Sequence, residues 1–352
     1  MRRKGCDFMA RDTVNNGNYL DDEKAKLVNP DNIELLNDFK EYLESIDRAT
    51  GTIEGYMSDS NVVFAWLLDC AKNKSFIDLT KRDIVKFQNY LMNDLKLGAG
   101  RIRRIRAFMS SMSNFIEAVL DDEYPNFRNI ISKIPAPVNN PVRKKTILED
   151  EQVEELLDYL VEKEQYQKAC ILALAWASGS RKSELLRYKV SYFVEENKLF
   201  GGSLYKTPEK MKTKGRGRAG KLLEKYVLVG KFEKYFNLWM EEREKYGIDS
   251  DELFLSAYKS NPRPMKVGAL DNYAEEFTKF LGVDFYFHCL RHNFTTGLSQ
   301  AGIPHHVIKE IVGWSDVSMV LTYDDSTVDD KLGDYFGEEG IKKVEKKTLN
   351  DL

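Results

Sequence analysis

The chain has 352 residues and a formal net charge of −3, so its overall charge does not mark it as a nucleic-acid binder. Its length suffices for two domains, each with its own core. The four cysteines have no paired spacing, which argues against a disulfide framework or a zinc site.

No apolar stretch is long enough to cross a bilayer, and no apolar run follows the charged N-terminal residues as it would in a signal peptide. We therefore expect a cytoplasmic protein without membrane contact. The sequence holds neither a nucleotide-binding glycine loop nor a clustered-carboxylate motif, so we expect no cofactor and no metal.

Residues 1–28 are polar and lack apolar periodicity, which indicates a flexible tail or an arm that orders on DNA. Helical periodicity then predicts a helical domain over 29–133. Thr80 is expected to cap its third helix, and the glycines at 98 and 100 to break the chain before the fourth. The apolar stripe of the first helix is expected to consist of Ile33, Leu36, Phe39, Leu43 and Ile46.

The fourth predicted helix begins with a dense basic run. Like charges at this density repel one another unless an anion lies against them, and no acidic residue follows until Glu117. A solvated basic face is the ordinary explanation of such a run. We favour contact with DNA phosphates or the major groove. The residues concerned are Arg101, Arg103, Arg104 and Arg106.

The apolar periodicity stops over 134–145, where three prolines indicate a semi-extended linker. We place the domain boundary in this linker. Its last basic residues, Arg143, Lys144 and Lys145, are further candidate DNA contacts. A second domain is expected over 146–328 and a C-terminal tail over 329–352.

The second domain opens with a helix predicted from Glu151 to about Lys163, and the apolar segment 169–177 follows as a buried helix. Arg181 then stands at the N-terminus of another helix, where the helix dipole disfavours a cation. That placement is reasonable if an anion binds there, assisted by the N-terminal amides. Glu184, one turn on, can hold the guanidinium, although an ordinary i,i+3 ion pair has the same spacing.

Strand signals at 192–194, 199–200 and 226–229 predict a small antiparallel sheet. The segment 201–225 is strongly basic, with eight Lys or Arg against two Glu, and three of its glycines fall within six residues. We interpret it as a hairpin that follows DNA phosphates, with Arg216 and Arg218 among its contacts.

The stretch from His288 to Tyr323 contains two predicted amphipathic helices with polar side chains at their ends. Gly302 is expected to end the first helix, and Gly313 to end the second. The buried stripe of the second helix is expected to be Val307, Ile308, Ile311 and Val312. The side chains at the helix ends are His288, Arg291, Trp314 and Tyr323, an arrangement that suits a polyanion site.

Each of these residues has an ordinary structural explanation when taken alone. A single Tyr is usually half-buried in a core, and a His–Arg pair is usually a surface or capping feature. The helix–glycine–helix pattern over 292–313 also fits a helix-turn-helix that reads DNA without chemistry. The combination of residue types and their spacing favours a catalytic interpretation.

With these motifs, the second domain resembles the catalytic domain of the tyrosine recombinases, the family of phage and mobile-element integrases. Its Gly-Ser-Arg181-Lys-Ser-Glu184-Leu is similar to the family's Gly-Leu-Arg-x-x-Glu-Leu motif, and His288-Cys-Leu-Arg291-His292 to its His-x-Leu-Arg-His box. Gly-Trp314 stands where many members have Gly-His, and Tyr323 follows at the usual interval. The resemblance runs from Thr146 onward. The helical domain before it is similar to the family's core-binding domain by layout only.

The resemblance implies a mainly α fold with a small antiparallel β-sheet, namely a helical core-binding domain and a mixed α/β catalytic domain. It also implies site-specific cleavage and rejoining of DNA through a 3′-phosphotyrosine, for integration or excision of a mobile element. Arg181 and Arg291 would clamp the phosphate oxygens, and Tyr323 would attack the phosphorus. His288 would accept the phenolic proton or bond a phosphate oxygen, supported by His292. Trp314 would donate one indole hydrogen bond and exclude water.

A lysine on the basic hairpin would protonate the departing 5′ oxygen, and both Lys214 and Lys212 fit that place. The expected partners are double-stranded DNA, a homotetramer assembled on it through the tail 329–352, and an accessory DNA-bending protein. Two alternatives stay open. One is strand relaxation of the type IB topoisomerase kind, and the other is a non-enzymatic helix-turn-helix DNA-binding regulator.

Overall fold

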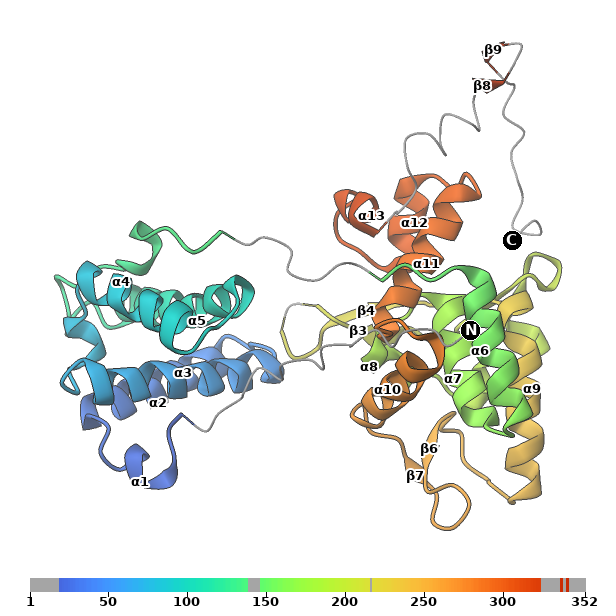
Figure 1. The fold of residues 1–352 in the computed structure, drawn as a ribbon, viewed down its shortest axis with the longest axis horizontal. Coiled ribbons are helices and arrows are strands. Elements are labelled where there is room, and N and C mark those ends of the chain that lie inside the picture. Colours follow the sequence, from blue (N-terminus) through green and yellow to red (C-terminus); the bar gives the residue numbers. More distant parts are fainter. Residues whose placement is uncertain (1–18, 139–145, 216, 324–335, 338–339, 342–352) are drawn as a thin grey trace, which may run out of the picture. The chain divides into compact units, whose positions relative to one another are not determined.

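The structure is a computed structural model that describes residues 19–138, 146–215, 217–323, 336–337 and 340–341. The chain divides into two compact units, Met1–Lys144 with Gly215–Gly220, and Lys145–Lys214 with Lys221–Leu352 (Figure 1). The first unit is helical in its described part, and the second combines helices with small antiparallel sheets. The predicted fold class is therefore confirmed. None of the described helices is long and apolar enough to span a membrane.

The first unit packs its helices around one apolar core, with α3 against α5 and both against α2 (Figure 1). The helices are α1 (Asp22–Ala25), α2 (Pro30–Ser45), α3 (Thr50–Cys70), α4 (Lys81–Asn89) and α5 (Ala99–Val119). A π-helical turn, Tyr90–Asp94, continues α4, and short 3-10 turns occupy Phe76–Asp78 and Ile131–Lys133. Val28 is 3% exposed, so this core takes in residues before the predicted boundary at 29.

The cap of α4 is as predicted, but α5 already begins at Ala99 and includes Gly100, and the buried face of α2 differs from the predicted stripe. Thr80 caps α4 in a reciprocal capping box with Asp83. In α2, Leu35 is buried, whereas Ile33 is 36% and Ile46 44% exposed. Asn32 shares this buried face, where its amide oxygen accepts the Phe76 backbone N–H at 2.7 Å.

The second unit is organised around α7, which is buried over residues 169–178 and packs against α6, α9 and α11 (Figure 1). Its first helices are α6 (Asp150–Glu162), α7 (Tyr166–Ser178), α8 (Lys182–Leu185) and α9 (Val229–Lys245). The later ones are α10 (Ala269–Leu281), α11 (Phe287–Gln300), α12 (His305–Val312) and α13 (Ser318–Tyr323). In α12, Ile308 and Val312 are buried as predicted, but Val307 is 37% exposed.

The strands of the second unit form separate small antiparallel sheets. One has the order β1 (Lys198–Leu199), β2 (Leu204–Lys206), β5 (Tyr226–Leu228). Between β2 and β5 the chain forms a hairpin of β3 (Met211–Thr213) and β4 (Lys221–Leu223), in which Thr213 pairs with Lys221. The other pairs are β6 (Leu255–Ser256) with β7 (Arg263–Pro264), and β8 (Phe336–Gly337) with β9 (Gly340–Ile341).

Two predictions for this unit are corrected. Residues 192–194 form no strand, because Val190–Tyr192 is a 3-10 turn that places Tyr192 and Phe193 in the core. Phe200 also leaves the strand, at a left-handed φ of 53° at the start of a second 3-10 turn. Sequence analysis did not identify the helix α10, although Leu270, Tyr273, Ala274 and Phe277 recur at helical spacing; Leu270 and Phe277 are buried and the other two pack against the core.

Candidate active site

Arg181 lies in the turn between α7 and α8. Gly179 ends α7 with a left-handed φ of 55°, and a Cβ there would lie 2.5 Å from the ring of Phe294, so only glycine fits. Arg181 then occupies the N-terminal cap of α8. Its Nη1 donates to Oε1 of Glu184 at 2.7 Å, and its backbone N–H donates to Oε2 at 3.1 Å. The expected contact between Arg181 and Glu184 is therefore present.

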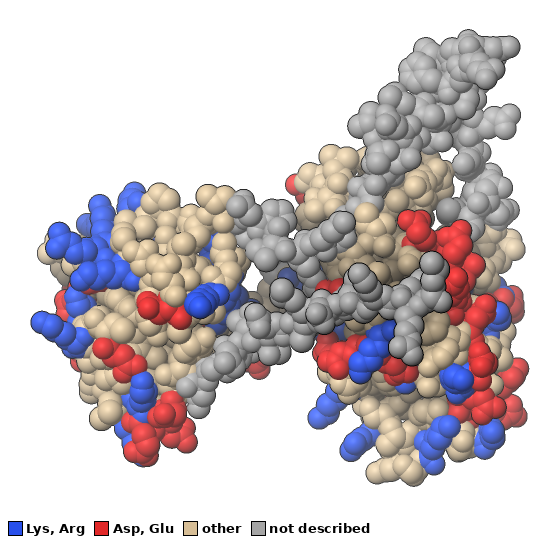
Figure 2. Space-filling model, in the orientation of Figure 1, with Lys and Arg blue, Asp and Glu red and all other residues tan. Residues whose placement is uncertain are grey.

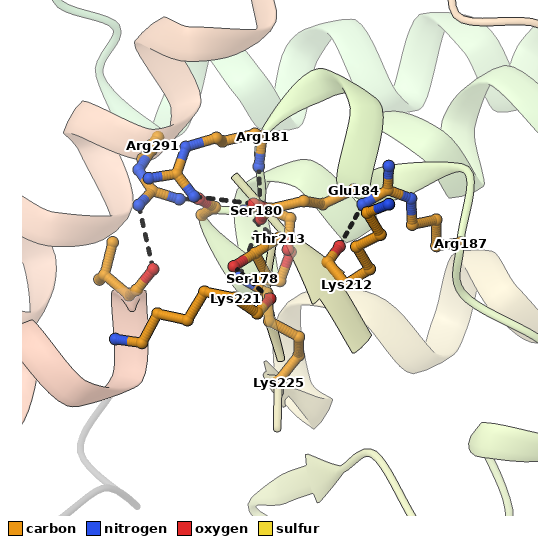
Figure 3. A network of polar contacts seen from close by, with 12 residues as sticks. Ser178, Ser180, Arg181, Glu184, Arg187, Lys212, Thr213, Lys221, Lys225 and Arg291 are labelled. Atoms are coloured by element: carbon orange, nitrogen blue, oxygen red, sulfur yellow. Dashed lines mark hydrogen bonds and ion pairs between the residues drawn. The ribbon is translucent and has the colours of Figure 1, made fainter. Parts of the chain in front are cut away.

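Glu184 holds a second cation, Lys225, which sequence analysis counted only as one basic residue of the hairpin. Lys225 Nζ lies 3.0 Å from Glu184 Oε2, and both residues are buried (Figure 3). Burial by itself raises the pKa of Glu184, but Lys225 and Arg181 outweigh it and hold that pKa at about 2. Burial lowers the pKa of Lys225, and Glu184 opposes that shift. Glu184 is thus an ionised carboxylate shared by two cations.

Arg291, in the first half of α11, is fully buried beside Arg181 (Figure 3). Its Nη1 donates to the Gly179 carbonyl at 2.8 Å and its Nη2 to the Val312 carbonyl at 3.0 Å. Its Nε has no hydrogen-bond partner among the described residues. Burial, followed by the positive charge of Arg181, lowers the pKa of Arg291 to about 10. Within the described part of the chain no carboxylate contacts this buried guanidinium, which is therefore prepared for an anion.

Tyr323 ends α13 and lies against three aromatic side chains of the same chain. Its hydroxyl is 2.7 Å from His288 Nε2, and its ring stacks on His292 with centroids 4.3 Å apart. The Trp314 ring is 4.6 Å from Tyr323 and 5.1 Å from the Arg291 guanidinium carbon. The structure therefore brings together Tyr323, His288, Trp314 and Arg291. Arg291 in turn contacts the turn that carries Arg181, through the Gly179 carbonyl.

Gly313, directly before Trp314, ends α12 as predicted. Gly313 caps α12 with a left-handed φ of 81°. A Cβ on Gly313 would collide with a methyl of Leu223, so strand β4 packs directly on this turn. The hairpin is thus in contact with the segment that leads to Trp314 and Tyr323.

The hairpin carries three lysines near the site, one more than sequence analysis considered. Thr213 and Lys221 are register partners, so their side chains leave the same face of the hairpin, and Thr213 is buried. Lys212 lies on the opposite, exposed face, where its carbonyl accepts a hydrogen bond from Arg187. Lys214 is exposed where β3 ends. Figure 3 shows Lys221 extending to the side of Arg291, away from Lys212.

The basic run at the start of α5 has an acidic partner that is distant in sequence. Asp59 of α3, 1% exposed, accepts a hydrogen bond from Arg101 and lies 3.4 Å from Arg104 Nε. The Arg104 side chain is still 60% exposed. Arg103 is also exposed and donates to the Pro137 carbonyl at 3.0 Å. In Figure 2, Lys and Arg side chains gather at the upper left of this unit, over the region of α4.

Arg106, which sequence analysis predicted as a DNA contact, points into the first unit. It is 7% exposed and donates to the Gln88 side chain at 2.8 Å and to the Ile131 carbonyl at 2.9 Å. Its guanidinium therefore ties α5 to α4 and to the segment after α5. Arg143, Lys144, Lys145 and Arg216 lie outside the described residues. Arg218 is described, with Nε 3.8 Å from Asp47 Oδ1 within the first unit.

Comparisons with known proteins agree with this geometry. Residues 146–329 match the Phage integrase family, and residues 35–126 match the phage integrase N-terminal SAM-like domain. The chain is 29% identical over 249 residues to the SPbeta prophage-derived recombinase-like protein YomM of Bacillus subtilis strain 168. That match covers 69% of this chain and 72% of YomM.

Solved structures of two recombinases share the fold. A lambda integrase tetramer bound to a Holliday junction has a TM-score of 0.60 at 14% identity, covering 83% of this chain and 76% of that one. The XerH site-specific recombinase bound to a palindromic difH substrate has a TM-score of 0.57 at 20% identity, covering 77% of this chain and 75% of that one.

Proposed function

Because the chain belongs to the phage integrase family, the tyrosine recombinases, and is therefore a site-specific DNA recombinase, we propose that Tyr323 is its nucleophile. In this proposal the enzyme cuts and rejoins double-stranded DNA through a 3′-phosphotyrosine, to integrate or excise a mobile element. The observation that carries the proposal is the 2.7 Å contact between the Tyr323 hydroxyl and His288, beside a turn that holds two guanidiniums.

Cleavage transfers a phosphoryl group from the 5′ oxygen of the DNA to the oxygen of Tyr323. The Tyr323 oxygen attacks the phosphorus of one backbone phosphate while its proton passes to His288 Nε2. The bond from phosphorus to the 5′ oxygen breaks, and that oxygen takes a proton from a lysine of the hairpin. Rejoining reverses these steps, with a 5′ hydroxyl as nucleophile and Tyr323 as leaving group. The phosphotyrosine conserves the energy of the broken bond, so no nucleotide cofactor is consumed.

Arg181 and Arg291 supply the charge for the five-coordinate phosphorus, whose non-bridging oxygens carry more negative charge than those of the diester. Arg291 is rigid because its Nη atoms are bound to two carbonyls. Arg181 is held on one side by Glu184 and keeps about a quarter of its side chain exposed (23%), so it can still meet an oxygen. Trp314 is 4% exposed and packs on Arg291 and Tyr323, which keeps water away from the reacting atoms.

The general acid is one of the three hairpin lysines, and the register favours Lys221 over Lys212. Lys221 shares the inward face with the buried Thr213. It is also close to the C-terminal half of α12: a hydrogen bond from Lys309 is the main cause of the lowered pKa of Glu310, and the charge of Lys221 adds to it. Lys214 remains the candidate that best matches the family motif.

Replacing the 5′ oxygen by sulfur separates these lysines. A thiolate is a far better leaving group than an alkoxide and needs no proton. The variant that removes the acid, among Lys221→Met, Lys214→Met and Lys212→Met, should therefore be slow on the oxygen substrate and recover most of its rate on the sulfur substrate. A lysine that only binds DNA should be slow on both.

The proposal also covers the DNA substrate and the assembly of several copies of this chain. We take duplex DNA as the substrate and a homotetramer on two sites as the active assembly, with an accessory DNA-bending protein as a further partner. Arg103 and Arg104 are the contacts proposed for the first unit, because they stay exposed. The solved lambda integrase tetramer on a Holliday junction gives the precedent for this assembly in a protein of the same fold.

Covalent capture from a mixture of DNA sequences tests the proposal even though the target site is unidentified. The protein is incubated with a pool of duplexes that have a randomised core and a nick, so that cleavage just before the nick releases a short fragment and cannot reverse. Covalent adducts are isolated and sequenced. Wild-type protein should yield an adduct on one family of sequences, and Tyr323→Phe should yield none.

The other outcomes are equally informative. An adduct that survives Tyr323→Phe would assign the nucleophile to another residue. Specific binding without any adduct would favour a DNA-binding regulator. Adducts with relaxation of single-site plasmids but no exchange between two sites would favour a topoisomerase-like activity.

A further inference from the structure

Lys225 is the most buried lysine described in the chain, at 1% exposure, and it lies at the root of the hairpin. It follows β4 and precedes β5. Its backbone N–H donates to Thr207 Oγ1 at 3.0 Å, and its carbonyl accepts the Thr207 N–H at 3.0 Å. The backbone is therefore fixed on both sides, and the side chain reaches Glu184 at the turn that carries Arg181.

The buried cluster carries more positive charge than negative. The carboxylate of Glu184 is surrounded by three cations, which are Arg181, Arg291 and Lys225. These four side chains together have a net charge of +2. A phosphodiester brings one negative charge to such a site, and the five-coordinate phosphorus brings two. The cluster is therefore balanced by the species that forms during the reaction and not by the ground state.

Lys225 also determines how strongly Glu184 competes with a phosphate oxygen for the guanidinium of Arg181. Oε2 of Glu184 is divided between Lys225 and the Arg181 backbone N–H, and only Oε1 contacts the Arg181 guanidinium. Without Lys225, both carboxylate oxygens would be free to grip Arg181 bidentately, the strong geometry of such pairs. Arg181 would then be neutralised by Glu184 and less able to bind a phosphate oxygen.

We propose that Lys225 is a positioning residue for strand cleavage, because its ammonium occupies Glu184 and so leaves the outer face of Arg181 to the reacting phosphate. Lys225 directs its ammonium to Glu184, so it acts through Glu184 and Arg181. This inference rests on the proposed function, because it concerns the same arginine pair.

The test measures the single-turnover rate of adduct formation on the captured substrate, together with DNA affinity. Lys225→Met removes the charge and keeps most of the stem. We expect it to slow cleavage about tenfold to a hundredfold, because a displacement of about 1 Å in a group that stabilises the transition state can cost on the order of a hundredfold, with little change in Kd. Lys225→Arg, which keeps the charge, should recover most of the rate.

The double variant Glu184→Gln with Lys225→Met separates positioning from a merely structural role. It removes the carboxylate that would capture Arg181 and restores the net charge, so it should cleave faster than Lys225→Met alone. If Lys225 only supports the fold, the second substitution should leave the rate equal or lower. The double variant also removes both members of the Lys225–Glu184 pair, so neither of these two groups is left buried without its partner where the single variant folds poorly. Its rate should stay within about tenfold of wild type, because Arg181 is then free of the carboxylate and can meet the phosphate.

Lys198→Met is the matched control. Lys198 is in β1 of the neighbouring sheet, has a 14% exposed side chain and pairs with Glu233 at 2.7 Å, outside the arginine cluster. Its loss should leave the cleavage rate unchanged. A wild-type rate for Lys225→Met, or no gain from adding Glu184→Gln, would overturn the inference while leaving the nucleophile assignment intact. Absence of an adduct with wild-type protein would overturn the proposed function itself, and the inference with it.

Discussion

Replacing Arg291 by Met should abolish cleavage and yet leave the DNA-free protein almost as stable as wild type. This is unusual for a residue with no exposed surface, since most substitutions at fully buried positions are costly. The reason is that the buried guanidinium contacts no carboxylate among the described residues, so the fold bears the cost of its charge until a phosphate binds.

The structure allows a rough magnitude. Burial and Arg181 lower the pKa of Arg291 to about 10, and the difference from its ordinary value corresponds to about 3 kcal/mol of destabilisation. The folded state holds this proton less tightly than the unfolded state, so the cost is fully present at pH 7 and is relieved only as pH rises beyond about 10. Losing the two hydrogen bonds to carbonyls costs roughly 1–2 kcal/mol each, which offsets most of the gain.

Urea unfolding at pH 7, followed by circular dichroism, measures the balance. We expect Arg291→Met to lie within about 1 kcal/mol of wild type, whereas Leu290→Ala, at the neighbouring and equally buried position, should lose about 2–5 kcal/mol. Inorganic phosphate should stabilise wild type and not Arg291→Met. If Arg291→Met were as destabilising as Leu290→Ala, Arg291 would be chiefly a structural residue.

Three further outcomes are expected. Glu184→Gln should destabilise the protein at pH 7, and the deficit should shrink as pH falls from about 4 toward 2. The wild-type carboxylate has its pKa held at about 2, and it loses its stabilising charge in that range; unfolding midpoints across this range measure the deficit. Arg104→Ala should weaken DNA binding and lower its salt dependence by about one phosphate contact, whereas Arg106→Met should lower Tm and leave the salt slope unchanged; anisotropy titrations at several salt concentrations decide this. Trp314→His should retain adduct formation and Trp314→Ala should lose at least tenfold, because a ring is needed between Arg291 and Tyr323; equal rates would contradict that role.

The sequence alone was enough to predict those features that depend on residues close together in the chain. Thr80 and Asp83 form a capping box three residues apart, and Gly313 ends α12 in the left-handed conformation that glycine favours. Arg181 and Glu184 are likewise one helical turn apart and meet as expected. The motif residues were identifiable because each occupies a defined place in a short pattern, such as His288 three positions before Arg291.

Only the tertiary structure decided which charges are paired across the chain. Lys225 and Glu184 are 41 residues apart, and Arg101 meets Asp59 from 42 residues away. No periodicity records such pairs, because they depend on how helices and hairpins pack and not on the residues between. The buried Asn32 of α2 finds its partner in the distant Phe76 backbone, and the inward hairpin lysine follows from the register of β3 with β4. Local hydrogen bonds and apolar spacing thus specify elements, whereas the electrostatics of the site arise only when those elements come together.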